Sequence, residues 1–135
     1  MELYEAMSTL RAVRRLKPDP IPDDVQTRIL NAATWAPTGG NVQPWRMVVV
    51  TDPDKKQALE NLYRPYWEAY IPGYEAKMKN MPAEVLASTT RALDAGTYLA
   101  NHMHEVPLIA VFCFNPEIMT ITDIDQPRTS VVGGG

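Results

Sequence analysis

Four cations lie close together near the start of a chain that is acidic overall. They are Arg11, Arg14, Arg15 and Lys17. Because a guanidinium fork matches the oxygens of a phosphate group in pairs, this cluster is a candidate phosphate-binding site. Arg11 and Arg14 are three residues apart, and on a helix this spacing places both guanidinium groups on one face. The alternative is that the four side chains compensate the dipole at the C-terminal end of a helix and are otherwise solvated.

The loop from residue 36 to residue 45 is the second candidate for chemistry. It contains two glycines, three polar side chains and a proline near each end: Gly39, Gly40, Thr38, Asn41, Gln43, Pro37 and Pro44. Glycines let a backbone approach a flat ligand closely, and the polar side chains offer donors and acceptors for the edge of an aromatic heterocycle. The prolines stiffen the loop and so preorganise these groups. The alternative is an ordinary turn between a helix and a strand, since the glycines match neither a dinucleotide-binding fingerprint nor a P-loop.

Hydrophobic spacing predicts the elements that must position these residues. We expect helices over residues 2–13, 23–36, 53 to about 63 and 83–103, and strands over residues 45–51 and 107–114. The first helix should end near residues 14–16, because Pro18 disfavours helical backbone in the residue before it. Apolar residues run almost continuously through both strands, which is typical of strands buried on both faces.

The segment from residue 63 to residue 74 is dense in aromatic residues and proline. Its members are Tyr63, Pro65, Tyr66, Trp67, Tyr70, Pro72 and Tyr74. Such a segment is a candidate lid that would shield a reaction from water. The alternative is an aromatic surface packed on the same chain or on a second copy, because aromatic residues are also enriched at interfaces.

The remaining reactive residue types predict no further site. His102 and His104 are two residues apart. Such positions do not share a helix face, so we predict ordinary helix-end residues and no metal site. Cys113 lies in an apolar strand and is predicted to be an inert core thiol. No arrangement of Ser, His and Asp, or of Cys and His, has the motif context of a catalytic nucleophile, so no catalytic side chain is assigned.

Composition limits the classes of function. With 135 residues, 45% of them hydrophobic and 21% charged, the chain is expected to form a single globular domain over residues 1–135. The net charge of −3 argues against a nucleic-acid partner. The single cysteine excludes an internal disulfide and favours a reducing compartment. With no leader pattern and no long apolar run, we expect a cytoplasmic protein that does not bind membranes.

The number of strands and the last residues of the sequence suggest an incomplete domain. Two predicted strands are fewer than a sheet usually contains. The sequence stops in three glycines, Gly133 to Gly135, with no capping element after them. We therefore expect the chain to be the front part of a longer fold.

The N-terminal half of the chain resembles the nitroreductase family of FMN-dependent flavoproteins. Residues 11–18 resemble the opening arginine motif of that family, and residues 29–50, especially 36–45, resemble its central signature. Residues 107–111 resemble a later core strand, and the terminal glycines resemble those that precede a long central helix. The resemblance implies an α+β fold, with helices packed on a mixed sheet, in an intertwined homodimer whose subunit interface holds FMN. The C-terminal part of that fold is missing from the sequence.

The resemblance also implies a cofactor-binding role for nine residues. They are Arg11, Ala12, Arg14, Arg15, Pro37, Thr38, Gly39, Asn41 and Gln43. Arg11 would bind the FMN phosphate, and Arg14 or Arg15 would lie near the ribityl chain or the pyrimidine edge. Residues 38, 39 and 41 would lie against the isoalloxazine or its tail, and Gln43 would support their loop. Ala12 stands where many members have a phosphate-binding serine, and Leu10 stands where many have another arginine.

The implied activity is a two-step hydride transfer that needs no protein nucleophile. NADH or NADPH would reduce the flavin, and an electron-poor small molecule such as a nitro compound or a quinone would then accept the electrons. Arg14 is the candidate cation that stabilises the reduced flavin at its N1–C2 edge. Two alternatives remain open: a flavin-binding protein without turnover, and a fragment that does not hold FMN.

Overall fold

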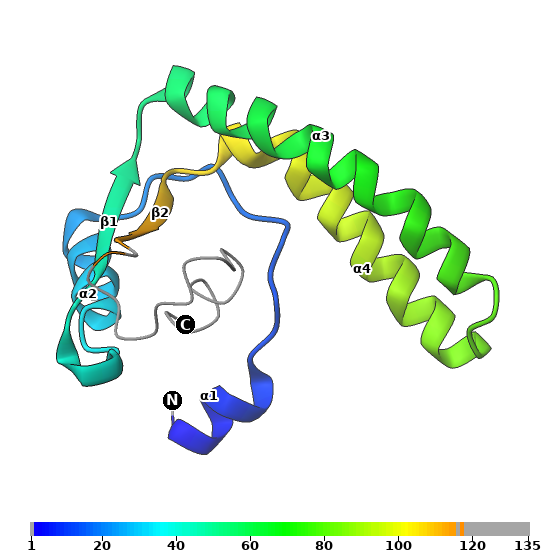
Figure 1. Ribbon diagram of the computed structural model, residues 1–135, viewed down its shortest axis with the longest axis horizontal. Helices are drawn as coiled ribbons and strands as arrows, with labels where there is room; N and C mark the ends of the chain where they lie inside the picture. Colours follow the sequence, from blue (N-terminus) through cyan, green and yellow to red (C-terminus); the bar gives the residue numbers. More distant parts are fainter. Residues whose placement is uncertain (1, 116, 118–135) are drawn as a thin grey trace. The chain divides into compact units, whose positions relative to one another are not determined.

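The computed structural model describes residues 2–115 and residue 117. In this part of the chain, the elements are α1 (Leu3–Thr9), α2 (Asp23–Ala33), the 3-10 turn η1 (Gly39–Asn41), β1 (Trp45–Val50), α3 (Pro53–Met78), α4 (Ala83–His102), the 3-10 turn η2 (Met103–Glu105) and β2 (Ile109–Phe114) (Figure 1). They belong to two compact units. Unit 1 contains residues up to 18 together with residues 52–106, and unit 2 contains residues 19–51 together with the described residues from 107 onward.

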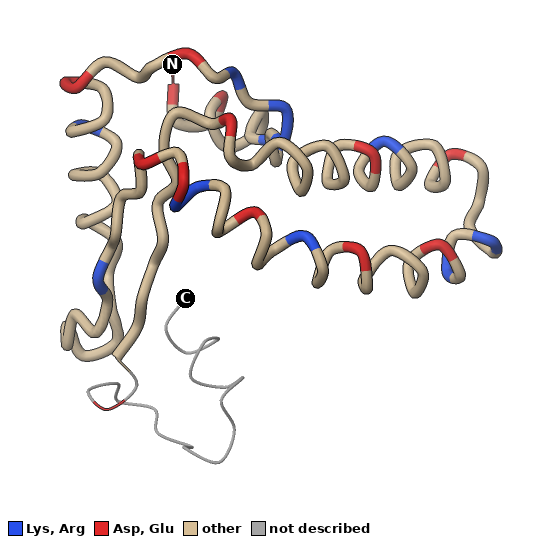
Figure 2. Tube along the Cα trace, turned by 90° about the horizontal axis from the view of Figure 1, so that it is seen from above, with Lys and Arg blue, Asp and Glu red and all other residues tan. Residues whose placement is uncertain are grey.

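Unit 1 is built on a hairpin of two long helices, α3 and α4, which we call the aromatic hairpin. Asp52 caps the start of α3 by accepting a hydrogen bond from the backbone N–H of Lys55 at 3.0 Å. A short turn after Met78 reverses the chain, and α4 returns alongside α3 (Figure 1). Figure 2 shows acidic and basic residues interspersed along both helices, which is typical of solvated outer faces.

The prediction that the third helix ends near residue 63 is wrong, because α3 continues through two prolines to Met78. A proline inside a helix costs about 3 kcal/mol. The helix persists because Trp67 packs closely on α4: a Cβ atom added to Gly96 would lie 2.4 Å from the Trp67 ring. The Trp67 indole N–H also donates to Thr97 Oγ1 at 3.1 Å. Tertiary packing therefore overrides the local signal of the prolines.

The first helix is shorter than its hydrophobic spacing predicts. It ends at Thr9, and Leu10 already has an extended backbone with ψ 130°. The hydroxyl groups of Ser8 and Thr9 donate to the Glu5 carbonyl at 3.1 and 2.6 Å, and such bonds weaken a helix end. The expectation that Arg11 and Arg14 share a helix face is therefore wrong, because neither residue is helical.

Unit 2 contains α2, η1 and a sheet. Helix α2 confirms the predicted second helix, although it stops at Ala33 and continues as a turn. Strands β1 and β2 pair antiparallel, with Trp45 opposite Phe114 and Val50 opposite Ile109. Within the described residues this pair is the whole sheet, where the resemblance implied a mixed one.

Two predictions about burial in the sheet are wrong. Val48 of β1 is 51% exposed and Phe112 of β2 is 50% exposed, so the strands are not buried on both faces. Cys113, predicted to be a core thiol, is also exposed. The physical reason is that burial on both faces requires a covering layer on each side, and a run of apolar residues does not specify that layer.

The single-domain prediction remains a prediction, and the terminal glycines lie outside the described residues. None of the helices in the described part of the chain combines the length and the apolarity that crossing a lipid bilayer requires.

Candidate functional site

The polar loop, residues 38–43, has an unusual backbone. Gly40, Asn41 and Gln43 have φ angles of 59°, 54° and 49°, all in the left-handed region. Glycine and asparagine adopt this region readily, whereas for glutamine it is uncommon and costs about 1–2 kcal/mol. Strained backbone of this kind persists only where surrounding contacts hold it, and it clusters at ligand sites.

Side-chain hydrogen bonds from Gln43 hold this backbone. Its Nε2 donates to Asn41 Oδ1 at 2.7 Å and to Thr38 Oγ1 at 3.2 Å. Its Oε1 accepts from the Trp45 indole N–H at 2.9 Å. The backbone N–H of Gln43 also donates to Thr38 Oγ1. Gln43 therefore supports the loop: its amide N–H groups bond within the loop, and its amide oxygen bonds to Trp45 of β1.

The other residues of the loop differ in exposure. Pro37, Gly39 and Asn41 are exposed, whereas Thr38 is half-buried. Because Asn41 Oδ1 accepts from Gln43, the donor end of the Asn41 amide points away from Gln43. An exposed glycine backbone beside an oriented amide donor is a suitable edge for a flat heterocycle with acceptor atoms.

The arginines of the predicted phosphate site lie in unit 1, on the connector that follows α1. Arg11 is exposed, and its Nη1 donates to the carbonyls of Ser8 and Leu10 at 3.1 and 2.7 Å. This is the dipole-compensating arrangement that the sequence left open as an alternative. Ala12 is also exposed. The bonds of Arg11 are solvent-exposed, so exchanging them for phosphate oxygens costs little.

Arg14 and Arg15 differ in what surrounds them. The Arg15 guanidinium lies 4.4 Å from the centre of the Tyr98 ring, and this ring stacks on His102 at 4.0 Å. Arg15 is therefore held on α4 by a cation–π contact. Arg14 is half-buried and lines a groove along α3.

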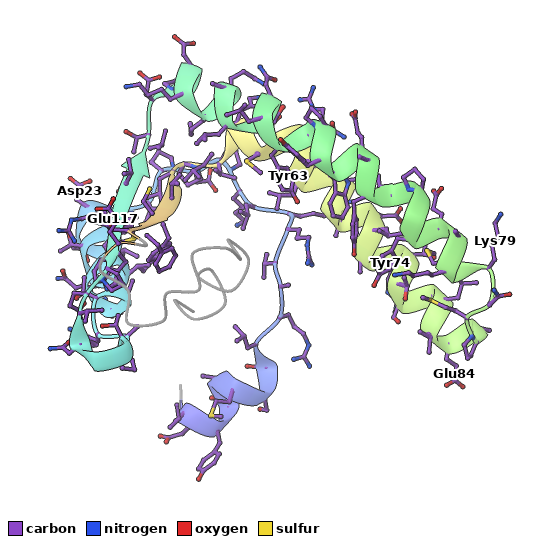
Figure 3. All side chains as sticks on the ribbon, viewed as in Figure 1. Asp23, Tyr63, Tyr74, Lys79, Glu84 and Glu117 are labelled. Atoms are coloured by element: carbon purple, nitrogen blue, oxygen red, sulfur yellow. The ribbon has the colours of Figure 1, made fainter. Side chains whose placement is uncertain are left out.

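The aromatic groove has a volume of about 370 Å³ and lies within unit 1. Arg14, Tyr63, Tyr66, Trp67, Tyr70 and Tyr74 line it, with Ala92 and Leu93 of α4. Tyr63, Trp67, Tyr70 and Tyr74 form a continuous ladder in which neighbouring ring centres are 6.5, 5.6 and 5.3 Å apart. Figure 3 labels the two ends of this ladder, Tyr63 and Tyr74. The aromatic segment thus packs partly on its own chain, while its role as a lid stays a prediction.

A buried charge cluster at the base of the aromatic hairpin escaped the sequence analysis. The Glu60 side chain is 1% exposed and accepts from the backbone N–H of His104 at 3.0 Å and from His104 Nδ1 at 2.5 Å. Arg64 pairs with the same carboxylate. Lys56, which is also buried, donates to the carbonyl of Val106 at 2.6 Å. These bonds tie the first turns of α3 to η2.

The Glu60 carboxyl remains ionised in this cluster. Burial by itself would raise the pKa of Glu60, but the hydrogen bonds from His104 and Gln57 outweigh burial and lower it to about 2. The prediction that His104 is an ordinary helix-end residue is therefore wrong. A signal was present in the spacing, because Lys56 and Glu60 continue the aromatic stripe at intervals of four and three residues.

Each of the two groups of predicted site residues lies within a single unit. Residues 11, 12, 14 and 15 belong to unit 1, and residues 37–43 belong to unit 2. Their convergence on one cofactor remains a prediction.

Comparison with known proteins identifies relatives of this chain. A family model described as "Nitroreductase family" matches residues 9–130. A protein named NADH dehydrogenase from Thermus thermophilus is 51% identical over 49 residues, which cover 36% of this chain and 24% of that protein. Iodotyrosine deiodinase 1 from Rattus norvegicus is 38% identical over 61 residues, covering 45% of this chain and 21% of that protein. The chain thus matches at most about a quarter of the length of these relatives.

A solved structure shows the same fold. It is a crystal structure of oxidized iodotyrosine deiodinase bound to FMN and 3-iodo-L-tyrosine, with a TM-score of 0.60 and 22% identity. The match covers 85% of this chain and 58% of that chain. The α+β architecture of the described residues is therefore a part of a larger known fold.

Proposed function

The chain belongs to the nitroreductase family, and we propose that it is an FMN-dependent oxidoreductase. It would pass hydride from NADH or NADPH to a nitro compound, a quinone or a similar electron-poor acceptor. The observation that carries the proposal is the polar loop, whose strained backbone and Gln43 hydrogen bonds preorganise an edge for a flat heterocycle. This loop lies inside the region that matches the family model.

The donor set of the chain fits FMN. A phosphate needs guanidinium or backbone donors, and Arg11 is an exposed guanidinium with replaceable bonds. The edge of the isoalloxazine carries hydrogen-bond acceptors, to which the Thr38 hydroxyl and the Asn41 amide N–H groups would donate, because their oxygens already accept from Gln43. Bound FMN would supply the hydride transfer itself. The chain would supply orientation through the polar loop and positive charge through Arg14.

Tyrosines 66 and 70 would exclude water from a reaction at the groove. Tyr66 is 79% exposed and Tyr70 is 50% exposed, so their rings are available to cover a ligand. Excluding water strengthens the electrostatic effect of a nearby cation, which here is Arg14. This supports the lid role proposed for the aromatic segment.

Reductive removal of a halogen from an aromatic ring is a second candidate. The relatives named iodotyrosine deiodinase include one from Danio rerio that is 32% identical over 77 residues, covering 57% of this chain and 25% of that protein. In such a reaction, two electrons and a proton convert a carbon–iodine bond into a carbon–hydrogen bond and iodide. Bound reduced FMN would supply these two electrons.

A homodimer is part of the proposal. Large apolar side chains such as Leu3 and Met7 of α1 and Trp35 after α2 are exposed within the described residues. Apolar side chains exposed in such numbers are typical of a surface that a partner covers. A cytoplasmic location is likewise a proposal, supported by the single cysteine.

The test is an absorbance spectrum of the purified chain together with its mass in solution. We expect near-stoichiometric flavin absorbance, a dimeric mass, and oxidation of NADH or NADPH when a nitroaromatic is added. Flavin absorbance without turnover would support a flavin-binding protein instead. A colourless monomer would contradict both the oxidoreductase and the flavin-binding protein without turnover.

A further inference from the structure

We propose that the aromatic groove selects aromatic ligands that carry a negative charge, so that the acceptor of this protein is a planar aromatic acid. The role of the ligand as acceptor rests on the proposed function. The binding preference itself rests on the lining of the groove: a wall of aromatic rings with an arginine beside it.

The wall of the groove is suited to stacking a flat ring. Trp67 is fixed by its hydrogen bond to Thr97 and by its close packing on Gly96, so it forms a rigid floor. Tyr66 is 79% exposed, whereas Tyr70 is 50% exposed and its ring lies between those of Trp67 and Tyr74. Offset stacking of an aromatic ring on such a surface adds binding energy beyond that of the area buried.

The charge in the groove is positive. Arg14 is the charged residue of the lining, and the other lining residues in the described chain are tyrosines, Trp67, Ala92 and Leu93. Arg14 Nη1 makes one long contact, 3.4 Å, with the carbonyl of Ala12, so its remaining N–H groups can turn to a ligand. A carboxylate accepts from such a fork in pairs. Its five N–H groups suffice for both a flavin edge and a ligand anion.

The neighbouring arginine shows why Arg14 is the selective residue. Arg15 lies over the ring of Tyr98 and is outside the lining of the groove. A wall of aromatic rings with no cation beside it would favour a cationic ligand, because ring faces attract positive charge. A guanidinium beside the wall repels such a ligand, because like charges repel. The presence of Arg14 therefore favours an anion over an amine.

The size of the groove limits the ligand to one or two rings. About 370 Å³ lies near the lower end of ordinary small-molecule pockets. Hydroxyl groups of the tyrosines can donate to ring substituents such as nitro or carbonyl oxygens. A benzoate with an electron-withdrawing substituent matches these requirements.

The experiment compares 4-nitrobenzoate with its neutral counterpart 4-nitrobenzamide on the purified full chain. Dissociation constants come from calorimetry or ligand-detected NMR, with flavin content measured in each sample. We expect the benzoate to bind about fivefold to tenfold more tightly, which corresponds to one charge-assisted hydrogen-bonded pair in a half-exposed site.

Arg14→Gln should abolish the difference between the two probes, while Lys17→Gln, an exposed cation outside the groove, should preserve it. Tyr70→Leu should weaken both probes to a similar extent. The ratio is compared between samples of equal flavin content, because bound FMN is itself an anion and affects the charged probe more than the neutral one.

Two results would overturn the proposal: equal or tighter binding of the benzamide by the unaltered chain, or a preference for the benzoate that survives Arg14→Gln. The proposed function is judged separately, by NADH or NADPH oxidation with the neutral benzamide. Turnover of the benzamide without a preference for the acid would leave the activity standing and remove this inference. A preference for the acid without turnover would leave this inference standing and remove the proposed activity.

Discussion

The polar loop and the aromatic hairpin are stabilised by contacts of very different sequence separation. In the loop, Gln43 bonds to Thr38 and Asn41, which are five and two residues away. In the hairpin, Glu60 bonds to a residue 44 positions away and Trp67 bonds to one 30 positions away. A local network forms from its own short sequence, whereas a distant one requires the helices to be docked first.

The comparison predicts that the hairpin loses more stability than the loop when its key residue is removed. Replacing Glu60 by Ala leaves Arg64 and His104 without their shared carboxylate. We expect a loss of about 3–5 kcal/mol in the free energy of unfolding, as for other broken buried ion pairs. Chemical denaturation followed by circular dichroism measures this.

Glu68→Ala is the matched control, since Glu68 lies exposed on the same helix. We expect that change to stay within about 0.5 kcal/mol. Equal midpoints for the two variants would show that the buried cluster does not stabilise the hairpin.

The same carboxylate makes the hairpin sensitive to acid. The pKa of Glu60 lies near 2 in the folded chain, below the ordinary value of 4.5. Its contribution is therefore fully present above pH 4.5 and is lost as the pH falls towards 2, by about 3 kcal/mol at most. Denaturation of the original chain and of Glu60→Gln between pH 7 and pH 2 measures the difference. A stability gap between the two that is constant over this range would contradict the assignment.

Replacing two glycines of the hairpin by alanine distinguishes the effect of close packing from that of helix propensity. A Cβ atom at Gly96 would lie 2.4 Å from the Trp67 ring, whereas nothing lies within 4 Å of one at Gly73. We expect Gly96→Ala to destabilise by about 1–3 kcal/mol through overpacking. Gly73→Ala should stabilise by up to about 1 kcal/mol, because alanine is the better helix former. Thermal unfolding of both variants measures these changes. If both unfolding temperatures shift in the same direction, the close packing of Trp67 on Gly96 is not what separates the two positions.

In the polar loop, Gln43→Ala removes the amide that bonds to Thr38, Asn41 and Trp45. We expect a loss of about 1–2 kcal/mol in stability, since these bonds are partly exposed. Flavin retention should fall as the left-handed turn relaxes. Gln57→Ala, which alters an amide of the hairpin, serves as the control and should leave flavin retention intact. If Gln43→Ala retains flavin as well as the original chain does, the conformation of the loop does not contribute to cofactor binding.

The smallest expected effect concerns the connector after α1. Arg11→Ala should weaken FMN retention by about threefold to tenfold, and more than Lys17→Ala does, because Arg11 holds the position implied for the phosphate. Equilibrium dialysis of FMN against both variants measures this. Equal affinities would refute the phosphate assignment.

Several elements were predictable because their signals are local. Pro22 with Asp23 and Asp24 predicts the start of α2, and runs of apolar residues predict the strands 45–51 and 107–114. The loop was singled out from its glycines and polar side chains, and its internal bonds span at most five residues. The ends of α1 and α3 were mispredicted, because hydroxyl groups competed with the helix in one and packing overcame proline in the other.

The sequence by itself determined the family of this chain, the existence of its main elements and the residues of the polar loop, because each depends on short stretches of specific residue types. Only the tertiary structure decided that Glu60 meets His104, that Trp67 seats on Gly96, and that Arg14, unlike Arg15, lines the aromatic groove. These pairings join positions tens of residues apart, and the pattern of residues along the sequence does not specify which distant side chains come into contact.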